Sequence, residues 1–81
     1  MIFIATFYSH FGAISFKKRC DAAGYAARLM PVPRDLSSSC GTCVRYDGSS
    51  MIPGSDIPED LEQIVQVTEA GYHPLYRAEN S

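Results

Sequence analysis

Residues 2–30, IFIATFYSHFGAISFKKRCDAAGYAARLM, predict a strand, a helix and a second strand in succession, and this order decides the fold. Residues 2–8 are almost all β-branched or aromatic, which is typical of a strand buried on both faces. In residues 11–23 apolar side chains recur at helical spacing, and Gly24 can end the helix with a positive φ. Residues 25–30 form a short strand that stops where two prolines remove backbone donors.

The middle of the chain predicts a third strand and a long loop. Residues 43–47, CVRYD, have the composition of a strand. Residues 48–57 are rich in glycine, serine, proline and aspartate, the residues that favour turns. Met51 and Ile52 interrupt this loop, and we expect them to cover a sheet edge or one end of the core.

The last third of the chain predicts a second helix and a fourth strand. The helix is expected to begin at residues 56–58, where an aspartate and a proline suit a first turn, and to end at Gly71. Its inner stripe would consist of Leu61, Ile64, Val65 and Thr68. Residues 72–78 predict a strand in which Pro74 is acceptable only at an edge or a bulge.

The resulting order, βαββαβ, predicts an α+β fold of the ferredoxin-like (split βαβ) type in a single domain, residues 1–81. Its four-stranded antiparallel sheet would carry both helices on one face, and the crossover rule leaves few other topologies. Both predicted helices end in Ala-Gly-Tyr, at residues 23–25 and 70–72, as two similar halves would. The second face of the sheet needs a cover, and we expect a second copy of the chain to supply it in a homodimer.

Composition excludes several classes of protein. The 81 residues are 46% hydrophobic and 20% charged, which is too apolar for a disordered chain. No apolar run reaches the roughly 20 residues that span a bilayer, so we expect no membrane partner. The N-terminal apolar stretch lacks the basic flank and cleavage site of a signal peptide, and three cysteines without one indicate a reducing, cytoplasmic setting.

Charge is distributed unevenly along the chain. Residues 17–45 carry six basic and two acidic side chains, a balance of +4, whereas residues 46–81 carry one basic and seven acidic side chains, a balance of −6. The positive half suits an anionic ligand or an acidic partner, although two solvated faces of opposite charge explain the same pattern. The cations are few and are not interleaved with aromatic residues that look exposed, which argues against nucleic acid as a partner.

Residues 31–45, PVPRDLSSSCGTCVR, concentrate reactive and turn-forming side chains. The predicted fold places them in a loop at one end of the sheet, beside His10 at the start of the first helix and beside His73. Cys40 and Cys43 are the candidate catalytic thiols. A pair with this CxxC spacing can exchange with disulfides, carry a sulfur or selenium atom, or bind a soft metal with further ligands.

The residues around the two thiols favour the anionic, reactive form of cysteine. Cations stabilise a thiolate, and the hydroxyl and backbone N–H groups of a serine run can form an anion-binding nest. The candidate binding and activating residues are Arg34, Ser38, Ser39, Gly41, Arg45 and His10. Cys20 lies on the apolar stripe of the first helix and is interpreted as a core residue. We expect neither a bound metal nor a cofactor.

The same segment resembles a known family of small bacterial proteins. PVPR at residues 31–34, SSCG at residues 38–41 and Arg45 are similar to the motif of the putative selenium/sulfur (Se/S) carrier protein-like family. The resemblance extends over most of residues 1–72, and it implies that Cys40, which matches the motif cysteine, handles sulfur or selenium. The loop at residues 48–57 is longer than the family's usual connection.

Three functions fit these residues, and a metal site is a weaker fourth. In the first, Cys40 accepts sulfur or selenium from a donor protein and passes it to an acceptor protein, with Cys43 assisting release. In the second, Cys40 and Cys43 form an intramolecular disulfide as a redox switch. In the third, the protein is a non-catalytic interaction or ligand-binding module with the loop as its recognition edge.

Overall fold

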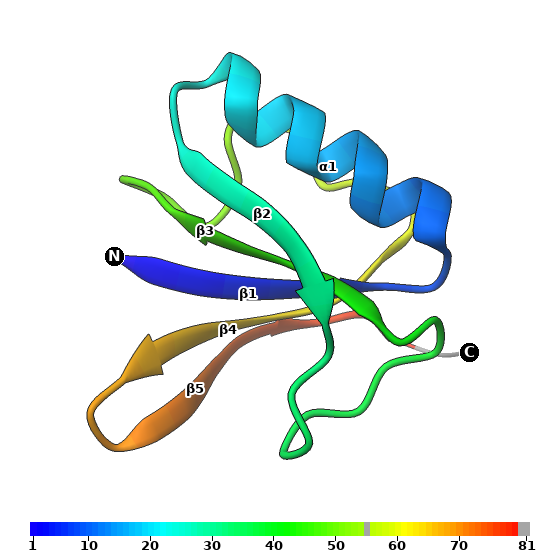
Figure 1. Cartoon of the computed structure of the whole chain (residues 1–81), viewed down its shortest axis with the longest axis vertical. Coiled ribbons are helices and arrows are strands. Elements are labelled where there is room, and N and C mark those ends of the chain that lie inside the picture. The colour runs from blue at the N-terminus through cyan, green and yellow to red at the C-terminus, as the bar shows by residue number, and fades with distance from the viewer. Residues whose placement is uncertain (55, 80–81) are drawn as a thin grey trace.

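The computed structural model describes residues 1–54 and 56–79, which form one helix and a five-stranded antiparallel sheet (Figure 1). In chain order the elements are β1 (Ile2–Phe7), α1 (His10–Ala22), β2 (Ala26–Pro31), β3 (Thr42–Asp47), β4 (Leu61–Thr68) and β5 (Gly71–Arg77). The strands lie in the order β2-β3-β1-β4-β5, so β1 is central and β2 and β5 are the edges. Within the described residues, no helix is long and apolar enough to cross a membrane.

The connections follow from the central position of β1. It pairs antiparallel with both β3 and β4, and β3 pairs antiparallel with β2. Because β1 and β2 therefore run parallel, with β3 between them, they need a crossover, which α1 provides. β3 and β4 also run parallel, on either side of β1, but the described part of their connection, residues 48–60, contains no helix.

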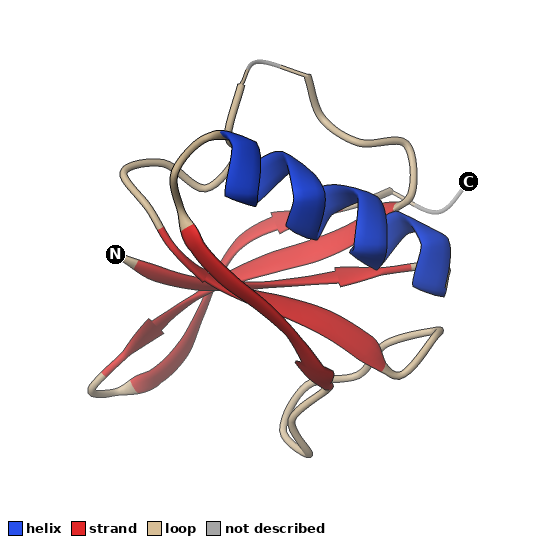
Figure 2. Cartoon of the chain, turned by 45° about the horizontal axis from the view of Figure 1, so that its top comes forward, coloured by secondary structure: helices blue, strands red, loops and turns tan. Residues whose placement is uncertain are grey.

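The predicted strand–helix–strand unit is present, with small changes at its ends. α1 begins after the N-cap Ser9, whose hydroxyl accepts a first-turn backbone N–H at 3.1 Å, and Gly24 follows the helix with φ +81°. Figure 2 shows α1 lying across one face of the sheet. Phe16 contacts Phe7 and Tyr46 there, with its ring centroid 5.2 Å from each of theirs.

Side-chain alternation divides the buried residues between the two faces of the sheet. The face toward α1 holds the larger core, formed by Phe3, Ala5, Phe7, Ala13, Phe16, Cys20, Val44, Tyr46, Leu61 and Ile64. The other face holds a smaller cluster of Ile4, Cys43 and Val65, against which Val32 and Leu36 pack. The chain's own loop, through Val32 and Leu36, partly covers this second face, so a second copy of the chain is not required to cover all of it. The homodimer stays a prediction.

The ferredoxin-like fold predicted from the sequence is wrong, because the residues expected to form a second helix form β4. The described residues contain five strands and one helix instead of four strands and two helices. The predicted fourth strand is β5, and a hairpin turn joins it to β4.

A β-bulge explains why the pattern of β4 imitates a helix. The register between β1 and β4 shifts at Thr6 and Phe7, which leaves Glu62 as an extra residue in β4. A bulge interrupts the regular alternation of side chains. Leu61 and Ile64 therefore reach the same core at a spacing of three residues, as they would on a helix.

The prediction for Pro74 is confirmed. It lies in β5, an edge strand, next to a second register shift at Ile64 and Val65. Both features tolerate a residue without a backbone donor. Gly71, expected to end a helix, instead begins β5 after the hairpin turn and has φ +116°.

Residues 48–54 and 56–60 occupy the place beside α1 where a second helix was expected. Arg19 of α1 donates from Nε to Pro53 O at 2.6 Å and from Nη2 to Asp56 O at 2.5 Å. Met51 and Ile52 pack against the larger core, as predicted. The connection therefore closes the helix-covered face without secondary structure of its own in the part described.

Candidate thiol site

The CxxC pair begins in the connection between β2 and β3, residues 32–41, which we call the motif loop. Both views of the chain place this loop at the end of the sheet where β1 ends and α1 begins (Figures 1 and 2). Val32 N donates to Gly41 O at 3.1 Å and closes the loop at its base. Further along, Leu36 N donates to Pro33 O at 3.0 Å in a turn. The backbone of the loop is therefore held in a defined shape.

The bulged residue of β4, Glu62, attaches the motif loop to the sheet. Its Oε2 accepts from Ser39 Oγ at 2.9 Å, and its Oε1 accepts from Ser39 N at 3.2 Å. Thr6 Oγ1 also donates to Oε1, at 3.2 Å. Bulges often redirect a side chain next to a functional site. The donors of Ser39, predicted as part of an anion-binding nest, thus hold a carboxylate of the chain itself.

Two further hydrogen bonds attach the serine run. Gln63 Nε2 donates to Ser37 O at 2.7 Å, and Ser38 Oγ donates to Phe7 O at 3.4 Å. Together with Glu62, these contacts join three consecutive serines to β1 and β4. The serine run therefore positions Cys40, the next residue along the chain.

The two thiols of the CxxC pair lie in different environments. Cys40 is half-buried, and its Sγ donates to Thr42 O at 3.3 Å. Cys43 is 0% exposed, and its Sγ donates to Pro31 O at 3.7 Å. Burial, with a smaller contribution from the nearby Cys40, raises the pKa of the Cys43 thiol from 9.0 to about 11. This shift lowers its thiolate fraction at neutral pH by about 100-fold.

Cys20 is a core residue, as predicted. It is 0% exposed on α1 and belongs to the larger core, on the face of the sheet away from Cys43. Burial raises the pKa of its thiol to about 11. Cys40 is therefore the one cysteine of the three that solvent reaches.

Other residues predicted for the site lie around the motif loop without binding the thiols. His10 is exposed at the start of α1, Arg34 is exposed in the turn of the loop, and Arg45 is half-buried further along β3. In the described structure, no hydrogen bond or ion pair joins either arginine to Cys40. Gly41 has φ +75°, a conformation that favours glycine next to the motif cysteine.

Histidines do not complete a ligand set around the CxxC pair. His73 was expected beside the loop, but this placement is wrong, because the helix expected to bring it there is a strand. His73 pairs with Gln66, and Gln66 pairs with Phe3 near the start of β1. Among residues 1–54 and 56–79, His, Cys, Asp and Glu side chains nowhere form a group of three that could hold a metal ion.

Glu62 and Gln63 are the site residues that sequence reasoning missed, because it placed both on a helix. The available signal was the run IVQVT that follows them, since β-branched residues favour strands. A strand there would have paired with the apolar β1 and brought both polar side chains to the end of the sheet that carries the motif loop.

A family model matches the part of the chain that contains the motif loop and the CxxC pair. The family model described as Putative Se/S carrier protein-like matches residues 3–52, from β1 through the motif loop to the residues that follow β3. The chain is also 40% identical over 42 residues to Uncharacterized protein YtiA of Escherichia coli (strain K12), over 52% of this chain and 49% of that protein. It thus spans about half the length of the curated relative that it matches. No solved structure matches the chain. Because the family model covers more than half of the residues, including both cysteines of the candidate site, the chain belongs to the Putative Se/S carrier protein-like family.

Proposed function

We propose that the protein carries sulfur or selenium on the thiol of Cys40. The observation that supports this function best is the difference in burial among the cysteines. Cys40 is half-buried in the motif loop, whereas Cys20 and Cys43 are 0% exposed with thiol pKa values raised to about 11. A carrier needs a thiol that donor and acceptor proteins can reach, and the family of the chain indicates which atoms are carried.

Sulfur transfer at Cys40 requires no oxidant. The Cys40 thiolate attacks the outer sulfur of a persulfide on a donor protein, and a new S–S bond forms while the donor's S–S bond breaks. The donor leaves as a thiolate, so no electrons are gained or lost overall. An acceptor nucleophile then attacks the same outer sulfur and releases Cys40 as a thiolate. Selenium follows the same steps in place of the transferred sulfur.

Cys43 has a secondary part in this function. Its thiol is covered by Val32 and Leu36 and stays protonated at neutral pH. When the motif loop opens, the Cys43 thiolate attacks the inner sulfur of the Cys40 persulfide, which forms the Cys40–Cys43 disulfide and releases hydrogen sulfide. An external dithiol then reduces that disulfide. Release through Cys43 is therefore slower than direct transfer to an acceptor.

The exposed residues at the end of the sheet that carries the motif loop contact the partner proteins. Arg34 and His10 are exposed in the motif loop and at the start of α1, and they provide polar surface at this end of the sheet for an acidic donor or acceptor. Ser38, Ser39 and Gly41 set the backbone conformation on either side of Cys40. Arg45 lies further from the loop opening, on β3.

Mass spectrometry after incubation with a cysteine desulfurase and cysteine tests the carrier function. The wild-type protein should gain the mass of one sulfur atom, and peptide mapping should place it on Cys40. Cys40→Ser should gain nothing, whereas Cys20→Ser is the matched control and should gain sulfur as the wild type does. Cys43→Ser should keep the adduct longer, because the internal release step is lost.

Two results would contradict this function. An adduct that persists in Cys40→Ser would assign the chemistry to another residue. A loss of two hydrogens from the wild type under mild oxidation, with no sulfur adduct under any condition, would instead assign a dithiol redox switch to Cys40 and Cys43.

A further inference from the structure

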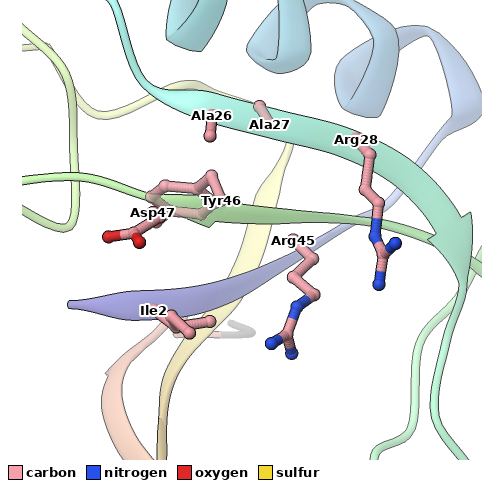
Figure 3. A pocket seen from close by; sticks show the side chains of 7 residues that line it. All are labelled: Ile2, Ala26, Ala27, Arg28, Arg45, Tyr46 and Asp47. Atoms are coloured by element: carbon pink, nitrogen blue, oxygen red, sulfur yellow. The ribbon is translucent and has the colours of Figure 1, made fainter.

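Two arginines lie directly opposite each other on β2 and β3, outside the motif loop. Arg28 and Arg45 are register partners in this antiparallel pair. Opposite residues of such a pair have Cβ atoms about 4.5–5.5 Å apart on the same face. Figure 3 shows both side chains projecting to the same side of the sheet, away from α1.

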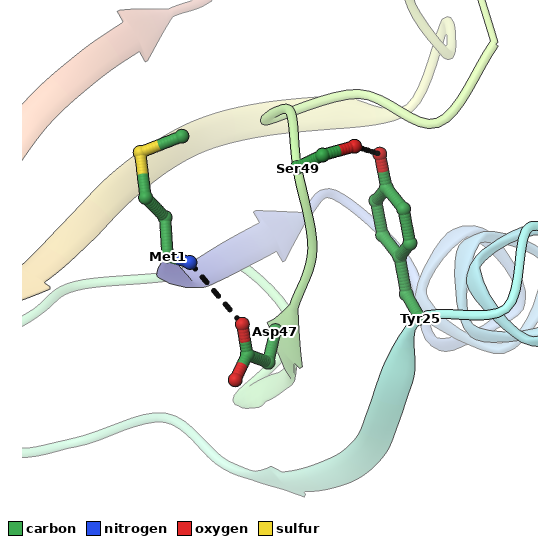
Figure 4. Close-up of polar contacts among 4 residues, drawn as sticks. All are labelled: Met1, Tyr25, Asp47 and Ser49. Carbon is green, nitrogen blue, oxygen red and sulfur yellow. Dashed lines mark hydrogen bonds and ion pairs between the residues drawn. The ribbon is translucent and has the colours of Figure 1, made fainter.

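Neither guanidinium group has a counter-ion in the structure described. The ion pairs found over residues 1–54 and 56–79 include neither Arg28 nor Arg45. Asp47, two residues from Arg45 on the same strand, is bound instead to the N-terminal amine of Met1 at 3.2 Å (Figure 4). Its carboxylate points away from both arginines (Figure 3). Since like charges opposite each other destabilise a sheet, the pair is unfavourable without an anion.

A cavity of about 270 Å³ lies beside this arginine pair. Its lining includes Ile2 and Ala26 together with Arg28, Arg45 and Asp47 (Figure 3). Pockets for drug-sized ligands have volumes of roughly 300–1,000 Å³, so this cavity suits a smaller molecule. It combines two cations and an apolar wall with one carboxylate, Asp47, which is already paired with the N-terminal amine. Two unpaired cations beside an apolar wall suit a ligand with one anionic and one apolar part.

We propose that Arg28 and Arg45 bind the oxyanion group of a small organic anion whose apolar part occupies this cavity. Guanidinium groups offer planar pairs of N–H donors that match carboxylate and phosphate oxygens. A bound oxyanion would also neutralise the two like charges that face each other across the strands. This site goes beyond the carrier function, since no step at Cys40 uses it.

NMR titration of the full chain tests the site with two defined probes, inorganic phosphate and phenyl phosphate, at constant ionic strength set with sodium chloride. Both should shift the Nε–H signals of Arg28 and Arg45 and the backbone amide of Asp47. The phosphate dissociation constant should be on the order of millimolar. Phenyl phosphate should bind more tightly, because its ring adds apolar contact with the cavity.

The variant carrying both Arg28→Gln and Arg45→Gln should bind each probe at least about tenfold more weakly. Arg77→Gln, on the opposite edge strand, removes the same charge per substitution and should leave both affinities within about twofold. Equal binding by the double variant would overturn the site, as would shifts that sodium chloride alone reproduces. Tighter binding of an acidic peptide than of phenyl phosphate, lost in the double variant, would overturn the small-molecule ligand and assign a protein partner.

Discussion

The two faces of the sheet are closed in different ways. On one face, α1 and the described part of the β3–β4 connection, residues 48–54 and 56–60, cover a core with four large aromatic side chains, Phe3, Phe7, Phe16 and Tyr46. On the other, the motif loop covers a small cluster of Ile4, Cys43 and Val65 at one end, and the arginine pair lies beyond it. The same five strands thus present a closed apolar face and a partly open polar one.

This difference separates stability from chemistry. Each fully buried large apolar side chain contributes about 1.5–3 kcal/mol, so the helix-covered face supplies most of the free energy of folding. The loop-covered face depends on hydrogen bonds to Glu62 and Gln63, which contribute about 0.5–1.5 kcal/mol each. Regions with few buried apolar contacts open at low free-energy cost. We therefore expect the motif loop, which carries Cys40, to open without unfolding the core.

The largest effect expected from this comparison is on stability. Phe16→Ala on the helix-covered face should lower the free energy of unfolding by about 3–5 kcal/mol, because a fully buried aromatic ring is lost. Leu36→Ala on the loop-covered face should lower it by less than about 2 kcal/mol, because Leu36 is only partly buried. Urea denaturation followed by circular dichroism measures both. Equal losses would mean that the motif loop belongs to the same cooperative core.

A second prediction concerns pH, because each face buries one thiol. Folded Cys20 and Cys43 keep their protons up to a pKa of about 11, whereas the unfolded thiols titrate near the ordinary value of 9.0. The stabilisation from each protonated thiol is therefore complete below pH 9 and is lost as pH rises toward 11, by up to about 2–3 kcal/mol per thiol. Urea denaturation at several pH values in this range measures the slope.

The two thiols serve as controls for each other. Cys20→Ala and Cys43→Ala should each flatten the fall in stability. Burial also raises the pKa of Tyr46, with a smaller contribution from Cys20, so Cys43→Ala is the variant that leaves the titration of Tyr46 unchanged. Alkylation sharpens the comparison further. Cys43 should react faster than Cys20 under native conditions, because exposing it needs only the loop to open. A reaction of both thiols at one shared rate would show that the loop opens only when the whole chain unfolds.

Smaller effects are expected at the bulge that holds the loop. Glu62→Ala should lower the free energy of unfolding by about 1–3 kcal/mol, because the donors of Ser39 and Thr6 lose their acceptor. Hydrogen exchange at the Ser39 amide and alkylation of Cys43 should both become faster. Glu69→Ala, in the exposed turn between β4 and β5, is the matched control and should change neither rate. Unchanged exchange at Ser39 would show that other contacts hold the loop.

The sequence predicted the first half of the fold well because its signals there are local. The strand composition of β1, the apolar stripe of α1 and the glycine after it each act within a few residues. The two Ala-Gly-Tyr sequences show where such local reasoning ends. Each glycine was predicted to end a helix, and both adopt a positive φ, but Gly24 follows a helix and Gly71 follows a strand. A glycine fixes the turn and not the element before it.

The candidate site was predictable in part for the same reason. Cys40 could be singled out because its motif is contiguous, and the burial of Cys20 followed from helical spacing. The contacts of Glu62 with the motif loop could not be predicted, because they depend on a register shift between strands that are more than 50 residues apart in the sequence. The pairing of the two arginines could not be predicted either, since only the register of β2 and β3 shows that Arg28 lies opposite Arg45.

The smallest predicted effect tests the charge of the open face. Arg28→Gln should raise the free energy of unfolding by about 0.2–1 kcal/mol at low salt, because it removes a like charge opposite Arg45. Arg77→Gln, whose register partner is the neutral Gln63, should give no such gain. The gain should shrink as salt is added, because dissolved ions screen the repulsion between the two arginines. The screening length is about 10 Å at 0.1 M and becomes shorter at higher concentration, so that charges close together are screened as well. A gain that persists at high salt would come from the backbone or from packing and not from charge. The two faces of the sheet would then differ in burial, but repulsion between the arginines would not destabilise the loop-covered face.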